Sequence, residues 1–294
     1  MNIKFYDSVR ECITNFEQLS IIKKITSIIM SYVNFFRFHI KESYSDTQND
    51  SQSIDKYILE PSLRTLSNGN GRDKLIVCLH GLGRDYCQFN ELIRELEKTN
   101  LANTTIYIPN IIEKGSAKLD SMIEPIVKEI QLWAINDKYR DKFHELILIG
   151  ISNGGRIARA IEANISIISN IKKIHFVSIV GACNGSSTAD LANKLGLSFL
   201  VSKAISEEMP TRSARSIQLN NDWINSFNNC TNINREYTFI ASPHDFHVPN
   251  KSSTLMEVPA QANVITRYAI ILNHGHLSIV DAVAKSITDL ICDI

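Results

Sequence analysis

Six short apolar runs alternate with helix-like segments between residue 74 and the end of the chain, and this alternation constrains the fold most. The run KLIVCL at 74–79 is almost entirely apolar, as in a strand that is buried on both faces. Further strands are predicted at 104–108, 145–149, 174–180, 237–241 and 266–272, and helices at 88–98, 117–133, 154–163 and 277–292. The pattern predicts an α/β fold whose central sheet is mostly parallel and is flanked by helices.

The N-terminal part of the chain has a different pattern. Residues 1–42 repeat apolar side chains at steps of three and four, which predicts an amphipathic helical extension. Such a helix either packs on the rest of the protein, or lies on a membrane or guards a site. Residues 43–70 begin with the polar run SYSDTQNDSQS and are predicted to be a linker or loop. The main domain is therefore expected at 71–294.

Composition and charge exclude several classes of protein. The chain has 294 residues, with 31 basic and 31 acidic side chains, and this balance argues against a nucleic-acid partner. Its six cysteines are scattered without metal-ligand spacing, so we predict free thiols, no metal and no cofactor. No run is long enough to span a bilayer, and the N-terminus does not resemble a signal peptide. The expected location is cytoplasmic, or exported without a cleaved signal, with peripheral membrane association left open.

The segment GISNGG at 150–155 is the first that indicates chemistry. It lies between a predicted strand and a predicted helix, so Ser152 would occupy a sharp strand-to-helix turn. Such a turn crowds the positions two residues before and two residues after its centre, and these are Gly150 and Gly154. The helix start behind the turn offers N–H groups to a developing negative charge. The pattern predicts that Ser152 is a nucleophile, although a glycine-rich turn without chemistry has the same letters.

A second glycine-rich segment, His80-Gly81-Leu82-Gly83, directly follows the strand at 74–79. Acyl transfer needs two N–H donors directed at the oxygen of a tetrahedral intermediate. One donor is expected from Asn153, which follows the nucleophile, and the other from Leu82 in this loop. His80 has either a catalytic or a structural role.

A serine nucleophile also needs a base and an acid that orients the base. His274 and His276 follow the last predicted strand, and His276 is the predicted base because it directly precedes a helix; His274 remains an alternative. Asp245 follows the preceding strand and is the predicted acid, whereas Asp190 and Asp222 do not follow strands. The neighbouring histidines of Asp245, at 244 and 247, do not have the spacing of a standard metal motif.

Together these segments resemble the lipase and esterase branch of the α/β-hydrolase superfamily. The resemblance rests on residues 80–83, 150–155, 245–249 and 275–276, with a softer likeness at 181–191. It implies an α/β-hydrolase fold with a Ser152–His276–Asp245 triad and an oxyanion hole formed by the amides of Leu82 and Asn153. It also implies a helical lid or cap insert at 182–215 over an acyl pocket. One departure is Ile151, because many lipases carry histidine before the serine.

The predicted function is that of a serine hydrolase that cleaves carboxylic ester bonds. The insert is rich in apolar residues and the N-terminal helix is amphipathic, which favours a lipid or long-chain acyl ester as substrate and peripheral membrane contact. Two alternatives stay open. One is an acyltransferase in which an alcohol replaces water, and the other is a catalytically silent protein of the same fold that binds a membrane or a partner.

Overall fold

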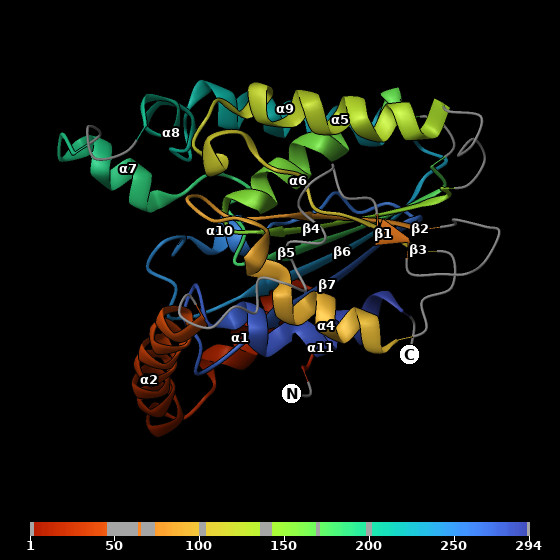
Figure 1. The fold of residues 1–294 in the computed structure, drawn as a ribbon. Coiled ribbons are helices and arrows are strands. Elements are labelled where there is room, and N and C mark those ends of the chain that lie inside the picture. The colour runs from red at the N-terminus through yellow and green to blue at the C-terminus, as the bar shows by residue number, and fades with distance from the viewer. Residues whose placement is uncertain are drawn as a thin grey trace.

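The computed structural model describes residues 3–45, 64–65, 74–99, 104–135, 143–168, 171–197 and 202–292 (Figure 1). Its strands are β1 (Arg64–Thr65), β2 (Lys74–Leu79), β3 (Thr104–Tyr107), β4 (Glu145–Ile151), β5 (Lys173–Ile179), β6 (Asn234–Ala241) and β7 (Val264–Ile270). Its α-helices are α1 (Val9–Glu17), α2 (Ile21–Ser45), α4 (Asn90–Lys98), α5 (Leu119–Ile135), α6 (Asn153–Ala163), α7 (Ser187–Lys194), α8 (Lys203–Glu208), α9 (Ala214–Asn229), α10 (Lys251–Thr254) and α11 (Ile279–Ile291). Short 3-10 turns cover Tyr86–Phe89, Ile112–Gly115 and Ile165–Ile167.

The strands form one sheet in the order β1-β3-β2-β4-β5-β6-β7. All neighbouring pairs from β3 to β7 are parallel, and only the two-residue β1 pairs antiparallel with β3 at the edge. The predicted α/β fold, with a mostly parallel central sheet flanked by helices, is therefore confirmed. Each predicted strand is present, but β6 begins three residues before its predicted start, because the polar Asn234 pairs with β5 and the polar Arg235 pairs with both β5 and β7.

The two faces of the sheet are covered by different helices (Figure 1). In β2, Leu75, Val77 and Leu79 point into a core formed with α5, α6 and α9. Ile76 and Cys78 point the other way, into a second core formed with α4 and α11. Burial on both sides explains why this strand has no polar alternation.

Helix α9 was not predicted from the sequence. It begins after Ser213, whose side chain accepts a hydrogen bond from the amide of Ser216 at 3.1 Å and caps the helix. Leu219, Trp223 and Phe227 are buried at helical spacing against the sheet. The cap and the spacing are both present in the sequence, but the predicted insert ends at 215 and no element was predicted for 216–229.

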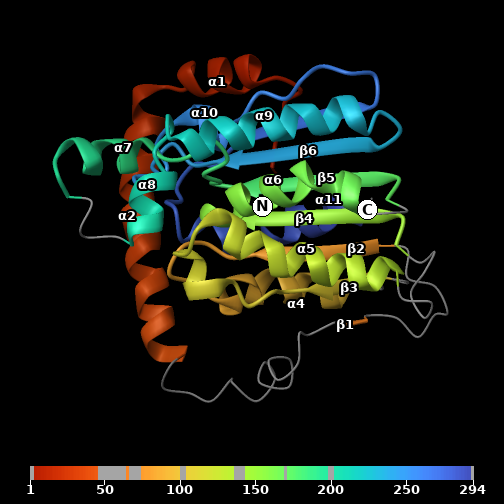
Figure 2. The ribbon, with the colours of Figure 1, turned by 90° about the horizontal axis from the view of Figure 1, so that it is seen from above.

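The N-terminal segment packs against the edge of the sheet that is formed by β7. Tyr6 forms an antiparallel bridge with Tyr268 of β7, and Cys12 of α1 is buried nearby. Helix α2 then runs across the edge of the sheet at which the parallel strands end (Figure 2). Most of the predicted linker at 43–70 lies outside the described residues. Among the described helices, none has the length and apolarity needed to cross a bilayer.

Candidate active site

Ser152 occupies the turn between β4 and α6 with φ 55° and ψ −121°, a conformation that non-glycine residues rarely adopt. Such a backbone costs on the order of 1–3 kcal/mol and persists only where its surroundings hold it. The amide of Ser152 donates to the carbonyl of Ile179 at 3.1 Å, and its carbonyl accepts from the amide of Ala182 at 2.8 Å. These bonds attach the turn to the end of β5 and the loop that follows.

The glycines around Ser152 are required by close backbone packing. A Cβ atom on Gly150 would lie 2.4 Å from the carbonyl oxygen of Gly154. One on Gly154 would lie 1.8 Å from the carbonyl oxygen of Leu79. No side chain fits at either position, so the turn depends on the two glycines that marked it in the sequence.

The His80–Gly83 loop packs directly against this turn. A Cβ atom on Gly81 would lie 3.1 Å from Cβ of Ser152. The amide of Gly81 donates to Oε1 of Gln88, and the amide of Gly83 donates to the carbonyl of Lys114, both at 2.8 Å. Between them, the amide of Leu82 has no acceptor among the described residues. This unbonded amide belongs to the loop that packs against the Ser152 turn, as the predicted oxyanion hole requires.

The second predicted oxyanion donor is the amide of Asn153, at the first position of α6, where a helix leaves N–H groups without intrahelical acceptors. Its side-chain Nδ2 donates to the carbonyl of Gly115 at 2.8 Å. Glu113, Lys114 and Gly115 all have positive φ angles, so the chain turns sharply here. This turn holds both Asn153 and the amide of Gly83, and the sequence analysis did not identify it.

The Asp245 and His276 side chains are joined by a hydrogen bond of 2.7 Å from Nδ1 of His276 to Oδ2 of Asp245. The other carboxylate oxygen accepts from the amides of His247 and Val248 at 2.8 and 2.9 Å. Both side chains are buried. The bond fixes the imidazole with its Nε2 atom free. No hydrogen bond joins Ser152 to His276 among the described residues, so this link remains a prediction.

The alternative residues have other contacts. The Nδ1 atom of His274 is buried without a partner in the described part of the chain, and its carbonyl accepts from the hydroxyl of Ser242. Asp190 accepts from the amide and hydroxyl of Thr211 at 3.1 and 2.7 Å. Asp222 lies on α9, 3.9 Å from Arg215. The geometry therefore favours His276 and Asp245 as the base and acid.

His80 has a structural environment. Its side chain is buried, and Nδ1 donates to the carbonyl of Gly81 at 2.9 Å, within the loop that carries Leu82. Burial lowers the pKa of His80 and favours the neutral ring. We infer that His80 shapes the loop and does not transfer protons.

Sequence reasoning gave no role to His247, which lies next to His276, the predicted base. Its ring stacks on that of His276 with centroids 4.6 Å apart, and burial, followed by repulsion from His276, lowers the pKa of His247. Potential ligand atoms of Asp245, His247 and His276 lie within 4.8 Å of one another. A metal ion bound to all three would compete with the bond between Asp245 and His276.

The loop that carries Asp245 is held from two sides. From the insert, the hydroxyls of Ser186 and Thr188 donate to the carbonyls of His247 and Phe246 at 2.7 and 3.1 Å. From α2, Ser27 lies 2.7 Å from Nε2 of His244. This contact gives His244 a structural role as a partner of α2, and no role for His244 was predicted from the sequence.

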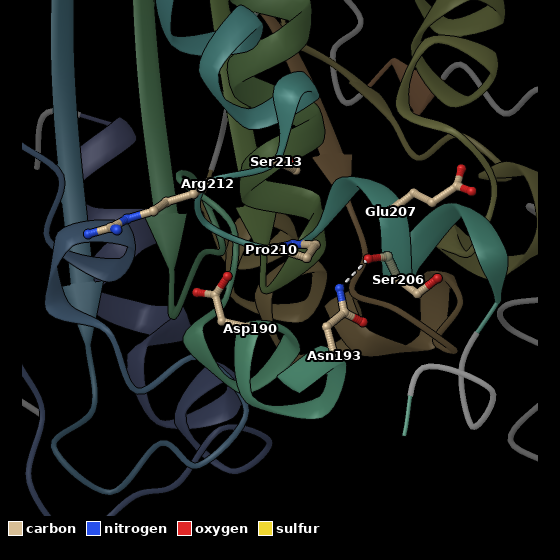
Figure 3. Close-up of a pocket in the computed structure, with 7 residues that line it drawn as sticks. All are labelled: Asp190, Asn193, Ser206, Glu207, Pro210, Arg212 and Ser213. Atoms are coloured by element: carbon tan, nitrogen blue, oxygen red, sulfur yellow. Dashed lines mark hydrogen bonds between the residues drawn. The ribbon is translucent and has the colours of Figure 1, made fainter. Parts of the chain in front are cut away.

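The insert at 182–215 contains α7 and α8, while its residues 198–201 lie outside the described residues. Two of its apolar residues, Ile205 and Met209, form a small buried cluster with Ala182 and Val248. A cavity of about 530 Å³ lies within the insert (Figure 3). Six of the seven residues that line it have polar side chains, and the lining comprises Asp190, Asn193, Ser206, Glu207, Pro210, Arg212 and Ser213. None of the predicted catalytic residues lines this cavity, so it does not correspond to the acyl pocket that the resemblance implies, and that pocket remains a prediction.

No protein-family model and no curated protein matches the chain. Among solved structures, phospholipase PlaB from Legionella pneumophila is 19% identical with a TM-score of 0.44, over 57% of this chain and 39% of that protein. This chain thus spans well under half the length of PlaB. A monoacylglycerol lipase from Paleococcus ferrophilus is 15% identical with a TM-score of 0.46, over 76% of this chain and 96% of that one. An extracellular α/β-hydrolase from a Paenibacillus species is 16% identical with a TM-score of 0.46, over 74% and 98%.

Proposed function

We propose that the protein is a serine hydrolase that cleaves carboxylic ester bonds of a lipid or another long-chain acyl substrate. The observation that carries the proposal is the strained Ser152 turn, at the same sheet edge as a buried, hydrogen-bonded Asp245–His276 pair. A backbone conformation of this energy is typical of functional sites. The unbonded amide of Leu82 beside Ser152 supports acyl chemistry in particular.

In the proposed reaction, Oγ of Ser152 attacks the ester carbonyl carbon while Nε2 of His276 takes the hydroxyl proton. The amides of Leu82 and Asn153 donate to the oxyanion of the tetrahedral intermediate. The leaving alcohol then takes the proton from His276, which leaves an acyl group on Ser152. Water attacks this acyl-enzyme with His276 again as base, the bond between the acyl carbon and Oγ of Ser152 breaks, and His276 returns the proton to Oγ as the carboxylic acid is released. Asp245 keeps the imidazole in the tautomer that this sequence requires.

The lipid or long-chain part of the proposal rests on apolar surface near the site. Phe246 follows Asp245 directly and has 68% of its side chain exposed. On the insert, Leu191 and Leu195 are exposed by 56% and 62%. Exposed apolar side chains around a site favour a substrate that has apolar chains. They also favour contact between the protein and the lipid aggregate in which such a substrate is found.

The test of the reaction is Ser152→Ala with a soluble chromogenic ester and with a fluorophosphonate probe. Ser206→Ala is the matched control, because Ser206 is half-buried on α8 and its hydroxyl donates to the carbonyl of Lys203 in the same helix. We expect turnover and covalent labelling to disappear in Ser152→Ala and to persist in Ser206→Ala. Wild-type turnover by Ser152→Ala would refute the proposal.

The substrate class is tested separately with p-nitrophenyl esters of increasing chain length. Activity should rise from acetate toward longer acyl chains, because a longer chain buries more apolar surface. A maximum at acetate would remove the long-chain part of the proposal and leave the serine chemistry intact. Addition of acceptor alcohols to the same assay shows whether water or an alcohol takes the acyl group.

A further inference from the structure

The described part of helix α2 presents polar side chains inward and apolar side chains outward. Ser27 and Ser31 are only 1% and 5% exposed. The outward side chains have exposures from 43% to 77% and are Ile21, Ile22, Ile25, Ile28, Ile29 and Tyr32. A helix that covers a protein core in water has the opposite orientation. The outward face therefore has the composition of a surface that is covered by something apolar.

Hydrogen bonds to the catalytic loops explain this orientation. The hydroxyl of Ser27 accepts from the amide of Asn273 at 2.8 Å and lies 2.7 Å from Nε2 of His244. One helical turn further than Ser31, Nδ2 of Asn34 donates to the carbonyl of Asn273 at 2.7 Å. His244 precedes Asp245, and Asn273 lies three residues before His276. Helix α2 is thus attached by its polar face to the loops that carry both members of the acid–base pair.

The spacing of the outward residues makes them one continuous stripe. Steps of one, three and four residues from Ile21 to Tyr32 place all six on the same side of an α-helix. Lys24 borders the stripe, with its ammonium donating to the carbonyl of Glu17 at 2.7 Å, Lys23 lies elsewhere on the helix, and residues 21–34 contain no acidic side chain. An aliphatic stripe on a helix that carries basic and no acidic side chains complements a bilayer with anionic head groups.

The helix that carries the stripe contacts the loop of the predicted acid Asp245. Phe246, which is exposed by 68%, belongs to the same loop as His244, the partner of Ser27. Figure 2 shows α2 standing across the ends of the strands, where that loop begins. A flat apolar surface that covers α2 would therefore face the catalytic edge of the protein.

We propose that α2 lies in the surface of an anionic lipid bilayer, with the stripe from Ile21 to Tyr32 buried among the lipids. This inference rests on the proposed hydrolysis of lipid esters and adds the surface on which the enzyme works. Because α2 is bonded to the Asp245 and His276 loops, docking orients the catalytic edge toward the bilayer. A helix that lies in the interface in this way buries its apolar side chains at the boundary between head groups and acyl chains.

The experiment is sedimentation with vesicles of phosphatidylcholine and phosphatidylglycerol, using the full chain with Ser152→Ala so that no lipid is consumed. The test variant adds Ile22→Glu and Ile29→Glu, which lie seven residues apart on the outward face. The matched control adds Ile217→Glu and Ile224→Glu, which are also seven residues apart and exposed, but on α9. We expect the test pair to weaken vesicle binding at least about tenfold and the control pair to leave it unchanged.

Three outcomes would overturn the docking proposal. These are no vesicle binding by the parent protein, equal binding by the test pair, or equal loss in both pairs. The molar mass of the parent protein in solution is measured as well. A dimer that the test pair converts to monomer, without vesicle binding by the parent, would assign the stripe to a second copy. Hydrolysis of a soluble ester by the wild type reports on the proposed function separately, so failure of one proposal does not imply failure of the other.

Discussion

The hydroxyl of Ser27, in the second turn of α2, lies 2.7 Å from Nε2 of His244, which directly precedes the predicted acid Asp245. The same hydroxyl accepts from the amide of Asn273 in the loop that carries His276. A hydroxyl that accepts from this amide has its own proton to donate to Nε2 of His244. One serine of the N-terminal extension therefore connects the two loops that carry the predicted acid and the predicted base.

Ser27→Ala should slow catalysis without weakening substrate binding. The substitution leaves the Asn273 amide and the His244 ring without this partner, so both loops gain freedom. We expect kcat on a soluble ester to fall about fivefold, and KM to stay unchanged, because a hydrogen bond of this kind contributes roughly 1 kcal/mol. Ser31→Ala is the matched control, since Ser31 is also buried on α2 but donates to the Ile28 carbonyl of its own helix. Equal kcat values for the two variants would contradict a positioning role for Ser27.

The attachment of α2 should weaken in acid through His244. Burial lowers the pKa of His244 below its ordinary value of 6.5, so the folded protein binds this proton less readily than the unfolded chain. Its contribution to stability is therefore fully present above pH 6.5 and is lost as the pH falls toward the lowered value. Protonated Nε2 also cannot accept the proton of Ser27.

Hydrogen exchange of the α2 amides as a function of pH measures this effect. Exchange, corrected for its intrinsic pH dependence, should accelerate below pH 6.5 in the wild type. His244→Gln keeps a side-chain acceptor that does not titrate, so its exchange should depend less on pH. The prediction is wrong if both proteins respond alike.

Asp245→Asn should retain the fold and lose nearly all turnover. The asparagine oxygen can still accept from the amides of His247 and Val248, while its NH2 group faces Nδ1 of His276. This forces the proton onto Nε2, where it prevents His276 from acting as base. We expect kcat to fall by about 10³–10⁴. Asp222→Asn on α9 controls for the loss of a charge, and a similar fall in that variant would argue against Asp245 as the specific acid.

Gly81→Ala should disturb the predicted oxyanion hole. The new methyl group would lie 3.1 Å from Cβ of Ser152, so the loop must move relative to the nucleophile. We expect kcat to approach the roughly 10²-fold loss that follows removal of one oxyanion donor. Gly275→Ala lies next to His276, but its methyl group would meet nothing closer than 3.7 Å, so activity should be retained. Undiminished turnover by Gly81→Ala would show that the loop does not contribute a donor.

The strands and the serine turn could be predicted because their signals are local. A strand buried on both faces requires a continuous apolar run, as in β2. The turn requires Gly150 and Gly154, because any Cβ atom there would collide with backbone. Helix α9 also carried a local signal, in Ser213 and the spacing of Leu219, Trp223 and Phe227, and could have been identified.

Contacts between distant segments could not be predicted in this way. The turn at 113–115 supports Asn153 from 38 residues away, and nothing near Gly115 indicates that partner. The choice of His276 over His274 rested on sequence placement alone, whereas in the structure the bond to Asp245 is made by His276 and the buried Nδ1 of His274 has no partner among the described residues.

The sequence by itself determined the sheet, the glycine-framed turn at Ser152 and the amphipathic character of the N-terminal helix, because each follows from periodicity or from steric limits within a few residues. The tertiary structure alone decided which face of α2 points outward. A helical pattern shows that a helix has a polar and an apolar face, but not which of the two packs against the protein. In α2 the packed face is set by the bond between Ser27 and His244, which are 217 residues apart. That bond turns the polar face toward the loops that carry Asp245 and His276, and the isoleucines face outward.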